Sequence, residues 1–430
     1  MRIVGGGTEA PAPRHLTNLR RGDGSFVLRR GRRAAAAALV VAAIAGCGGG
    51  SEPTVPPRCA AQPLADGAGF EEHTVFQGGL FGGSPDGYPV FRIPSIVSTS
   101  SGVLLAFSEA RQSLADPGAG KIDLVMKQSL DCGRSWSEAG VLADNGSGDA
   151  HNPAAVVVPG RGSASRVWLF YNQRPASPGG EADLPPGLGA DSASIWLRTS
   201  DDDGASWSEP RELTREVKDP AWAIASMGPG LAIVTRTGSA AGRIVVPGWY
   251  TRDGHEGSFA FASDDGGKTF ARLALPEPTT NESQLVELSD RTLVLDGRQN
   301  SGLGLERRQL FASQDGGATW SAPTAGLAMV PIMSSVLRYS ARRDGDAADL
   351  LLHSGVSTLT RIGARVWASG DEGASWDHET VIEPGFAQYS VLTVLDDGTI
   401  GMLYESVGGS GGAVGFDIRL ARFAPAFLGL

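Results

Sequence analysis

The segment Ser129-Leu130-Asp131-Cys132-Gly133-Arg134-Ser135-Trp136 is the first of five copies of the pattern S-x-D-x-G-x-[ST]-[WF]. The other copies occupy residues 200–207, 263–270, 313–320 and 369–376. In each copy the aspartate can accept hydrogen bonds from backbone N–H groups and close a turn, and the glycine two positions later tolerates a positive φ. The hydroxyl residue can bond locally, and the aromatic residue packs back under the hairpin. Five copies form an internal repeat of about one four-stranded sheet each, which predicts a β-propeller.

Length and composition agree with an all-β fold. The 430 residues include 60 Gly and 26 Pro, a content typical of many short strands joined by tight turns. From about residue 70 onward, short apolar alternations separated by Gly, Asp and Pro predict strands, and no amphipathic helix of three turns is found. Dividing roughly 360 residues by a repeat of about 60 predicts six blades, one of them atypical. The segment 416–423 is expected to complete the sheet that the N-terminal strands begin.

Charge and cysteine content restrict the classes of function. The net charge is −10, and no stripe of Lys or Arg occurs in the repeat region. We therefore expect no nucleic-acid surface and no basic membrane-binding face. Cys59 and Cys132 either form one disulfide in an oxidising compartment or remain free. Neither has a His or Cys at metal-ligand spacing, so we expect no metal site.

The N-terminal 47 residues have the features of a secretory signal. A basic run at residues 29–33 precedes 12 apolar residues, 34–45, which are too few to span a bilayer as a helix. The residues before Cys47 resemble a bacterial lipobox, whose cysteine becomes the lipidated first residue of the mature protein. The alternative is an ordinary cleaved signal with an incidental cysteine. We predict a signal peptide over 1–47, a flexible tether over 48–69 and the propeller over 70–430, so that the protein is held on the cell envelope by a lipid or is secreted.

Three arginines lie at the ends of predicted strands. Arg92 lies in F-R-I-P (residues 91–94), Arg298 follows the apolar run 292–295, and Arg361 ends T-L-T-R (residues 358–361). A buried arginine is costly unless it meets an anion, so three from different blades could converge on one carboxylate. Taken singly, each is more simply explained as a solvated surface residue or a local salt bridge.

F-R-I-P, the five repeats and N-E-S-Q-L-V-E-L (residues 281–288) together resemble the bacterial exo-α-sialidases of the six-bladed Asp-box type. The resemblance covers roughly residues 91–405. It implies that Arg92, Arg298 and Arg361 bind the carboxylate of sialic acid. Arg361 is assigned from the stretch R-I-G-A-R-V-W-A-S-G-D-E-G, in which Arg365 is a close alternative.

The resemblance also implies an acid/base aspartate in the loop that follows E-A-R (residues 109–111). Asp116 takes this role, and Asp123 in the following strand is the alternative, which we expect to be structural. Arg111 is implied to line the substrate pocket.

A nucleophile pair of tyrosine and glutamate is implied as well. The family's Y-S step places the tyrosine at Tyr389, and the glutamate corresponds to Glu282. Glu287 is a structural alternative. Tyr404 and Glu405 lie in a strand, and we expect them to serve in packing and a local hydrogen bond.

These residue types suit the chemistry of sialic acid. Its anomeric carbon carries a carboxylate, so a neutral phenol deprotonated by a glutamate avoids the repulsion that a carboxylate nucleophile would meet. Asp116 would protonate the leaving oxygen and then activate water. We predict a retaining, monomeric exo-α-sialidase that needs no cofactor and acts on sialylated glycoproteins, glycolipids or oligosaccharides. The alternatives are a trans-sialidase and a non-catalytic Asp-box propeller that binds glycans.

Overall fold

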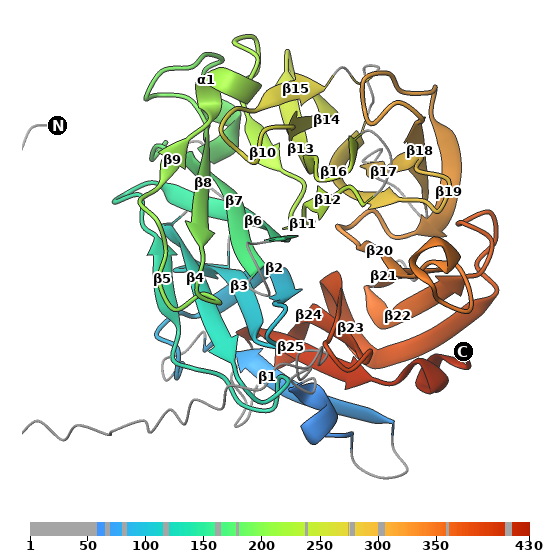
Figure 1. Ribbon diagram of the computed structural model, residues 1–430. Coiled ribbons are helices and arrows are strands. Elements are labelled where there is room, and N and C mark those ends of the chain that lie inside the picture. Colours follow the sequence, from blue (N-terminus) through green and yellow to red (C-terminus); the bar gives the residue numbers. More distant parts are fainter. Residues whose placement is uncertain are drawn as a thin grey trace, which may run out of the picture. The chain divides into compact units, whose positions relative to one another are not determined.

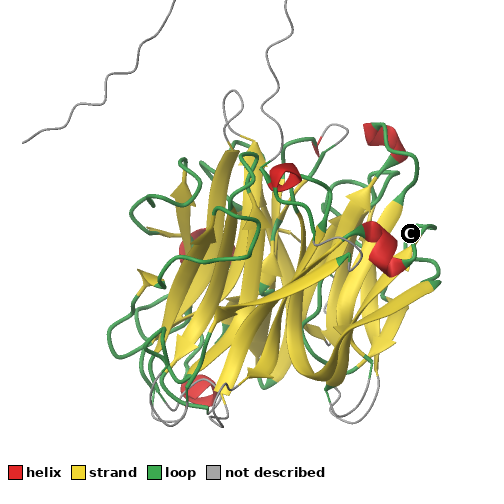
Figure 2. Cartoon of the chain, turned by 90° about the horizontal axis from the view of Figure 1, so that it is seen from below, coloured by secondary structure: helices red, strands yellow, loops and turns green. Residues whose placement is uncertain are grey.

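Short antiparallel strands, grouped in sheets around a common centre, make up most of the computed structural model (Figure 1). The strands run between two loop-rich faces (Figure 2). The structure describes residues 58–64, 69–79, 84–114, 120–159, 165–177, 180–236, 240–273, 275, 280–299, 306–357, 361–408 and 415–430. The all-β character predicted from the sequence is confirmed.

The strands form hydrogen-bonded sheets of 16, 5 and 4 strands, and these sheets can be divided into four-stranded units, each built mostly from consecutive segments. The first two units are β2 (Val90–Ser98), β3 (Leu104–Arg111), β4 (Ile122–Ser129) and β5 (Gly140–Ala143), then β6 (Asp149–Pro159), β7 (Ser165–Arg174), β8 (Ser194–Ser200) and β9 (Arg211–Glu212). The next two are β10 (Ala225–Met227), β13 (Ile244–Arg252), β14 (His255–Ser263) and β15 (Ala271–Leu273), then β16 (Thr280–Glu287), β17 (Leu293–Gln299), β18 (Glu306–Ser313) and β19 (Thr324–Met329).

The long strand β23 (His378–Val394) belongs to two neighbouring units. Its first half pairs with β22, and its second half pairs with β24. The two units are β20 (Val336–Ser340), β21 (Leu350–Val356), β22 (Ile362–Ser369) and β23, then β23, β24 (Ile400–Gly408), β25 (Gly415–Phe423) and β1 (Phe70–Phe76).

Short strands β11 (Gly230–Leu231) and β12 (Ile233–Val234) pair with β6 and β13, and helix α1 (Thr214–Val217) has a single turn. Short 3-10 turns cover Cys59–Ala61, Gly180–Asp183, Arg342–Asp344 and Pro425–Leu428.

The unit that contains β1 joins the two ends of the folded region. β1 pairs antiparallel with β25, from Phe70 opposite Phe423 to Phe76 opposite Ile418. β2 in turn meets β25 at Val90 opposite Phe416. The expected pairing of segment 416–423 with an N-terminal strand is therefore confirmed.

The five repeats form five turns with one shared hydrogen-bond pattern. In each, the serine hydroxyl accepts the N–H of the glycine at 2.7–2.9 Å and donates to the aspartate. The aspartate accepts the N–H and the hydroxyl of the following Ser or Thr. These bonds lower the pKa of Asp315 to about 2. The five glycines have positive φ, between 81° and 96°, as the sequence predicted.

In the repeats at residues 200–207 and 263–270, the aromatic residue also packs against a neighbouring unit. The ring of Trp207 meets Phe107 edge-on at 5.8 Å, and Phe270 meets Phe170 at 5.7 Å. At Gly267, an added Cβ would lie 1.7 Å from the ring of Trp168, so only glycine fits there. The repeats therefore close hairpins and also pack one sheet unit against the next.

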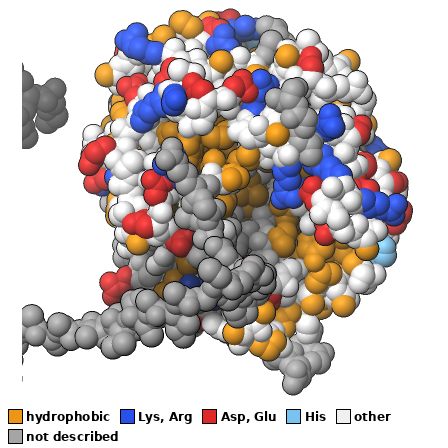
Figure 3. Space-filling view, viewed as in Figure 1, with side chains coloured by type: hydrophobic (Ala, Val, Ile, Leu, Met, Phe, Trp, Pro, Cys, Tyr) orange, Lys and Arg blue, Asp and Glu red, His pale blue; other side chains and the backbone are white. Residues whose placement is uncertain are grey.

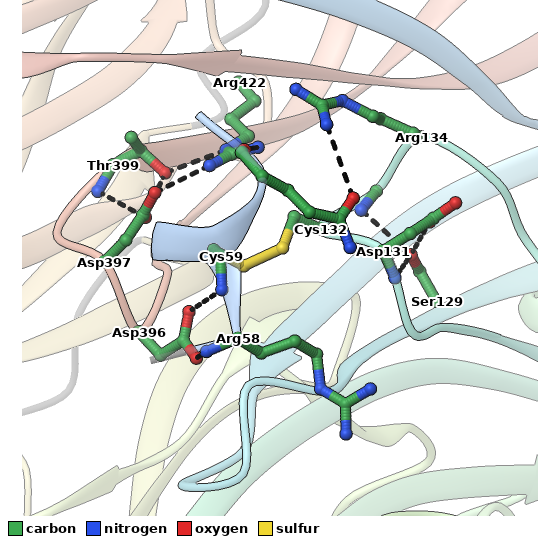
Figure 4. The surroundings of a disulfide bond; sticks show 12 residues. Arg58, Cys59, Ser129, Asp131, Cys132, Arg134, Asp396, Asp397, Thr399 and Arg422 are labelled. Carbon is green, nitrogen blue, oxygen red and sulfur yellow. Dashed lines mark hydrogen bonds and ion pairs between the residues drawn. A yellow bond between two sulfur atoms is a disulfide. The ribbon is translucent and has the colours of Figure 1, made fainter. Parts of the chain in front are cut away.

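A segment that precedes β1 is fixed to the sheets by a disulfide (Figure 4). Cys59 and Cys132 are bonded to each other, which resolves the alternatives that the sequence left open. The backbone N–H groups of Arg58 and Cys59 donate to the carboxylate of Asp396, at 2.5 and 3.1 Å. Residues 58–62 are thus anchored to the folded part although they precede Phe70. The second cysteine lies within the first repeat, so the bond joins this segment directly to a hairpin turn.

The predicted signal peptide, including Cys47, lies outside the described residues, as do tether residues 48–57. In the part of the chain that the structure describes, no helix has the length and apolar character needed to cross a membrane.

The disulfide is expected to stabilise the fold strongly. It closes a loop with a sequence separation of 73 residues. Loop-closure entropy then predicts that Cys132→Ser lowers the free energy of unfolding by about 4 kcal/mol. Urea unfolding of the variant and the oxidised wild type measures this difference, and wild type in reductant serves as the control that should match the variant. Coincident transitions for the variant and the oxidised wild type would contradict the prediction.

Candidate active site

Irregular pairing in four of the innermost strands positions the candidate residues. At each such place the inner strand carries extra residues relative to its partner, a β-bulge that bends the strand and re-aims its side chains. The shifts lie between Arg92 and Ser95 in β2, His151 and Ala154 in β6, Thr280 and Ser283 in β16, and Ala387 and Ser390 in β23. Glu282 and Tyr389 lie inside two of these bulges, and Arg92 borders a third.

Arg298, Glu282 and Tyr389 are in direct contact. Arg298 lies in β17, and its Nη1 donates to Glu282 Oε2 at 2.5 Å and to the Tyr389 hydroxyl at 2.9 Å. Glu282 and Tyr389 are 6% and 7% exposed. The hairpin of β16 and β17 and the sequence-distant strand β23 thus place a cation, a carboxylate and a phenol within one hydrogen-bond network.

Arg92 approaches the same tyrosine from another direction. Its guanidinium lies over the Tyr389 ring, 5.3 Å from the centroid, and over the Phe416 ring at 5.6 Å. Its Nε donates to Glu405 Oε1 at 2.9 Å. Burial opposes the charge of Arg92, but Glu405 raises the pKa above its ordinary value, so the guanidinium stays charged.

A buried carboxylate holds the bulge in β2. Ile93 has φ +56°, a costly conformation for a β-branched residue. Its N–H donates to the same Glu405 oxygen at 2.7 Å. Glu405 therefore fixes both the strained backbone and the guanidinium that precedes it.

The environment of Tyr389 keeps its hydroxyl protonated. Burial and the negative charge of Glu282 raise the pKa of Tyr389 above its ordinary value, while Arg298 and Arg92 lower it in part. The phenol is therefore neutral at physiological pH. It becomes a nucleophile only if a base takes its proton, and Glu282 is the carboxylate beside it.

Arg361 is connected to this cluster indirectly, by a hydrogen bond to Gln388. Its Nη1 donates to the Gln388 side chain, next to Tyr389 in the chain, and its backbone has φ +54°. The alternative, Arg365, instead pairs with Glu379 and donates to the Gly363 carbonyl. Arg361 thus bonds to the residue next to Tyr389, whereas Arg365 pairs with Glu379 nearer the start of the same strand.

Arg111 belongs to a neighbouring buried network. Its side chain bonds to Glu109 at 2.6–2.8 Å, and the other oxygen of Glu109 accepts the Asn152 N–H at 2.9 Å. Asn152 has φ +52° and lies in the bulge of β6. The predicted pocket role of Arg111 stays a prediction.

The predicted acid/base residue, Asp116, lies outside the described residues. Its alternative, Asp123, is buried. The Asp123 carboxylate accepts a hydrogen bond from the Tyr88 hydroxyl at 2.7 Å and forms an ion pair with Lys121 at 3.1 Å. These contacts support the structural role expected for Asp123.

Glu405 and Tyr404 differ from the sequence-based expectation. We expected packing and a local hydrogen bond, but Glu405 bonds to Arg92, which is 313 residues away. Tyr404 bonds to Glu72 and, at 3.5 Å, to Glu383. The expectation of a local bond was wrong because β24 lies beside β25 and close to β2, which the strand's own residues do not reveal. A fully buried glutamate within an apolar strand was the available signal, since such a charge requires a partner.

Glu287 lies at the opposite end of β16. There it accepts the Arg236 N–H at 2.7 Å and pairs with Arg343 at 3.4 Å. These groups line a cavity of about 350 Å³ whose walls are mostly aliphatic. Figure 3 shows such hydrophobic side chains around a hollow at the centre of one face. Glu287 is therefore far from Tyr389, as its structural assignment requires.

Among the described residues, one group has the spacing of metal ligands, namely Cys59, Asp396 and Asp397. The sulfur of Cys59 is part of the disulfide, so this group lacks a thiolate.

The fold and the site define a class: a propeller-like all-β protein with arginine, tyrosine and carboxylate side chains buried at the inner strands. Residues 102–402 match the model of the BNR repeat-like domain. The chain belongs to this family, within its bacterial sialidases.

Relatives of known class are similar over most of the chain. A sialidase of Micromonospora viridifaciens is 31% identical over 366 residues, which cover 80% of this chain and 53% of that protein. A sialidase of Bacteroides fragilis is 29% identical over 345 residues, covering 75% and 61%. The chain thus spans between half and two thirds of the length of these relatives. The structure of a Hadza microbial sialidase matches with a TM-score of 0.70 at 26% identity, over 81% of this chain and 68% of that one.

Removing the charge of Glu405 is expected to destabilise the protein. Glu405→Gln keeps an oxygen that can accept the Ile93 N–H but leaves the Arg92 guanidinium without its carboxylate. Breaking a buried pair in this way typically costs about 3–5 kcal/mol. Chemical denaturation measures the loss.

The matched control is Asp201→Asn. Asp201 pairs with Arg166 at 2.6 Å, but the two side chains are 64% and 50% exposed. This exposed pair should contribute less than about 1 kcal/mol. Equal changes in the two variants would show that Glu405 does not compensate a buried charge.

Proposed function

We propose that the protein is an exo-α-sialidase, which hydrolyses terminal sialic acids of glycoconjugates with retention of configuration through a tyrosyl intermediate. The observation that carries the proposal is the contact of Arg298 with both Glu282 and the Tyr389 hydroxyl. A neutral phenol beside a carboxylate and a guanidinium suits attack on an anomeric carbon that itself carries a carboxylate. The sialidase relatives support the same reaction class.

Arg92, Arg298 and Arg361 bind the substrate carboxylate. A guanidinium presents paired N–H donors whose geometry matches the two oxygens of a carboxylate, and such charge-assisted bonds are the strong ones. Arg92 lies over the Tyr389 ring and Arg298 donates to the Tyr389 hydroxyl, so a carboxylate held by both arginines would bring the anomeric carbon to the phenol. Binding there also orients the substrate, which lowers the entropic cost of attack.

The reaction has two balanced steps. In the first, the Tyr389 oxygen bonds to the anomeric carbon, Glu282 takes the phenol proton, and the aglycone oxygen leaves with a proton from Asp116. In the second, Asp116 removes a proton from water, the water oxygen bonds to the anomeric carbon, the bond between that carbon and the Tyr389 oxygen breaks, and Glu282 returns the proton to the phenol. The sugar leaves with the configuration that it had in the substrate.

We also propose that the four-stranded units are the six blades of an Asp-box propeller. The shared turn pattern, the joining of the terminal strands and the split of β23 between two units support this count. Substrates would be sialylated glycoproteins, glycolipids or oligosaccharides.

The decisive experiment traps the intermediate. A fluorinated sialosyl fluoride should label the wild type at Tyr389, and mass spectrometry of the peptides should locate the adduct. Tyr389→Phe deletes only a hydroxyl, so it should fold normally and remain unlabelled. Glu282→Gln should label more slowly because an amide cannot take the phenol proton.

The control and the products separate the alternatives. Tyr171→Phe removes a hydroxyl from another buried tyrosine in β7 and should label like the wild type. An adduct on another residue would overturn the assignment of Tyr389. Transfer of the sugar to an added acceptor, observed by NMR, would indicate a trans-sialidase, and binding of a sialoside without turnover would indicate a glycan-binding propeller.

We propose further that Cys47 carries a lipid anchor outside the cytoplasm. The support is the basic run, the apolar run and the lipobox-like residues that precede it. In a bacterium that processes lipoproteins, the wild type should incorporate labelled fatty acid and Cys47→Ser should not. Equal labelling of both proteins would exclude Cys47 as the site.

A further inference from the structure

Four apolar side chains form a continuous patch at the rim of the candidate site. Ile362 and Phe386 are cross-strand partners between β22 and β23, and Val407 and Phe416 are partners between β24 and β25. Directly opposed residues of antiparallel strands place their side chains on the same face, in contact. The Phe386 and Phe416 rings, 6.1 Å apart, connect the two pairs. We call these four residues the apolar rim.

The apolar rim is partly open to solvent. Ile362 is 44% exposed and Val407 is 43% exposed, whereas the two phenylalanines are half-buried. Most apolar side chains of the strands are buried, so neighbouring exposed ones indicate a contact surface. Isolated exposed apolar residues such as Leu130 and Val141 carry no such meaning.

The apolar rim reaches the residues proposed to bind the carboxylate. The Arg92 guanidinium lies 5.6 Å from the centroid of the Phe416 ring. Ile362 follows Arg361 directly, and Phe386 precedes Tyr389 by three residues. The rim therefore borders the arginine cluster.

The chemistry of the substrate then identifies the group that would touch this surface. In a sialoside the carboxylate and the glycosidic oxygen are attached to the same carbon. A surface that borders the carboxylate-binding arginines therefore also borders the bond to the leaving group. We propose that the apolar rim is the aglycone subsite and favours substrates whose leaving group is apolar. This inference rests on the proposed sialidase function and specifies its substrate class.

A pair of substrates isolates this effect. Methyl and octyl α-sialosides, used below the micelle-forming concentration, have alcohol leaving groups of similar basicity and differ in apolar length. Each methylene removed from water is worth roughly a fourfold gain in affinity. A partly exposed surface of four side chains would cover only one or two of the added methylenes, so we expect kcat/KM for the octyl substrate to exceed that for the methyl substrate by roughly tenfold.

The rim variants should remove the preference and leave the chemistry intact. Ile362→Ser combined with Val407→Ser should bring the octyl-to-methyl ratio close to one, with methyl sialoside turnover unchanged within about twofold, since neither side chain donates to the carboxylate. Val407→Ser alone should give an intermediate ratio and does not alter a neighbour of Arg361. Leu130→Ser and Val141→Ser are the matched controls and should keep the wild-type ratio.

The outcomes distinguish this inference from the function on which it rests. If the wild type cleaves both substrates equally well, or if the rim variants keep the preference, the aglycone subsite is overturned while the sialidase proposal stands. If the wild type cleaves neither, the sialidase proposal itself fails. If the variants lose activity on sialyllactose but keep the octyl preference, the rim binds a sugar ring and the proposal of an apolar leaving group is wrong.

Discussion

The ion pair between Glu405 and Arg92 is the interaction on which the candidate site depends. The glutamate is fully buried, and an isolated charge there would be very costly. The cost is offset because one of its oxygens accepts both the Arg92 guanidinium and the strained Ile93 N–H. The side chain of Arg92 and the bulge that aims it are thus fixed by the same atom. A cation held in this way is organised before any ligand arrives, so little reorganisation is needed when an anion binds.

The same device recurs in other sheet units. Glu109, on the second strand of its unit, bonds to Arg111 and to the N–H of Asn152 in the bulge of the next unit. Asp296, also on a second strand, pairs with Arg308 and with His353 of the following unit. Although burial opposes its charge, these partners lower the pKa of Asp296 to about 2. Buried carboxylates therefore connect neighbouring units near the axis, while the repeat turns connect them through packed rings. Polar and apolar contacts act together to hold the innermost strands in place.

Local patterns predicted the parts of this structure that local physics determines. The turns of the repeats could be predicted because serine, aspartate and glycine make all the necessary bonds within eight residues. The contact of Arg298, Glu282 and Tyr389 followed from motif resemblance, and no local pattern would have given it. The partner of Glu405 could not be predicted, because the strand alone indicates that a buried glutamate needs a partner, whereas the identity of that partner depends on how β24 lies relative to β2. The disulfide could not be predicted either, because Cys59 and Cys132 are 73 residues apart in the sequence and only the fold brings them together. The interactions between units are therefore the part of the structure that local sequence patterns could not predict.

The candidate site combines strained backbone beside charged groups with a partly exposed apolar surface, and these two parts suit different portions of a ligand. Ile93, Asn152 and Arg361 adopt positive φ, and each lies beside a charged or amide group that satisfies part of its backbone or side chain. Such strain persists only where the surroundings enforce it, so these contacts hold the backbone at the charged part of the site. The rim formed by Ile362 and Val407 is partly exposed and uncharged. Fixed arginine side chains suit the carboxylate that every sialic acid carries, because the geometry of a carboxylate does not vary between substrates. An apolar rim has no directional bonds to satisfy, so it can favour a class of leaving groups without demanding one shape.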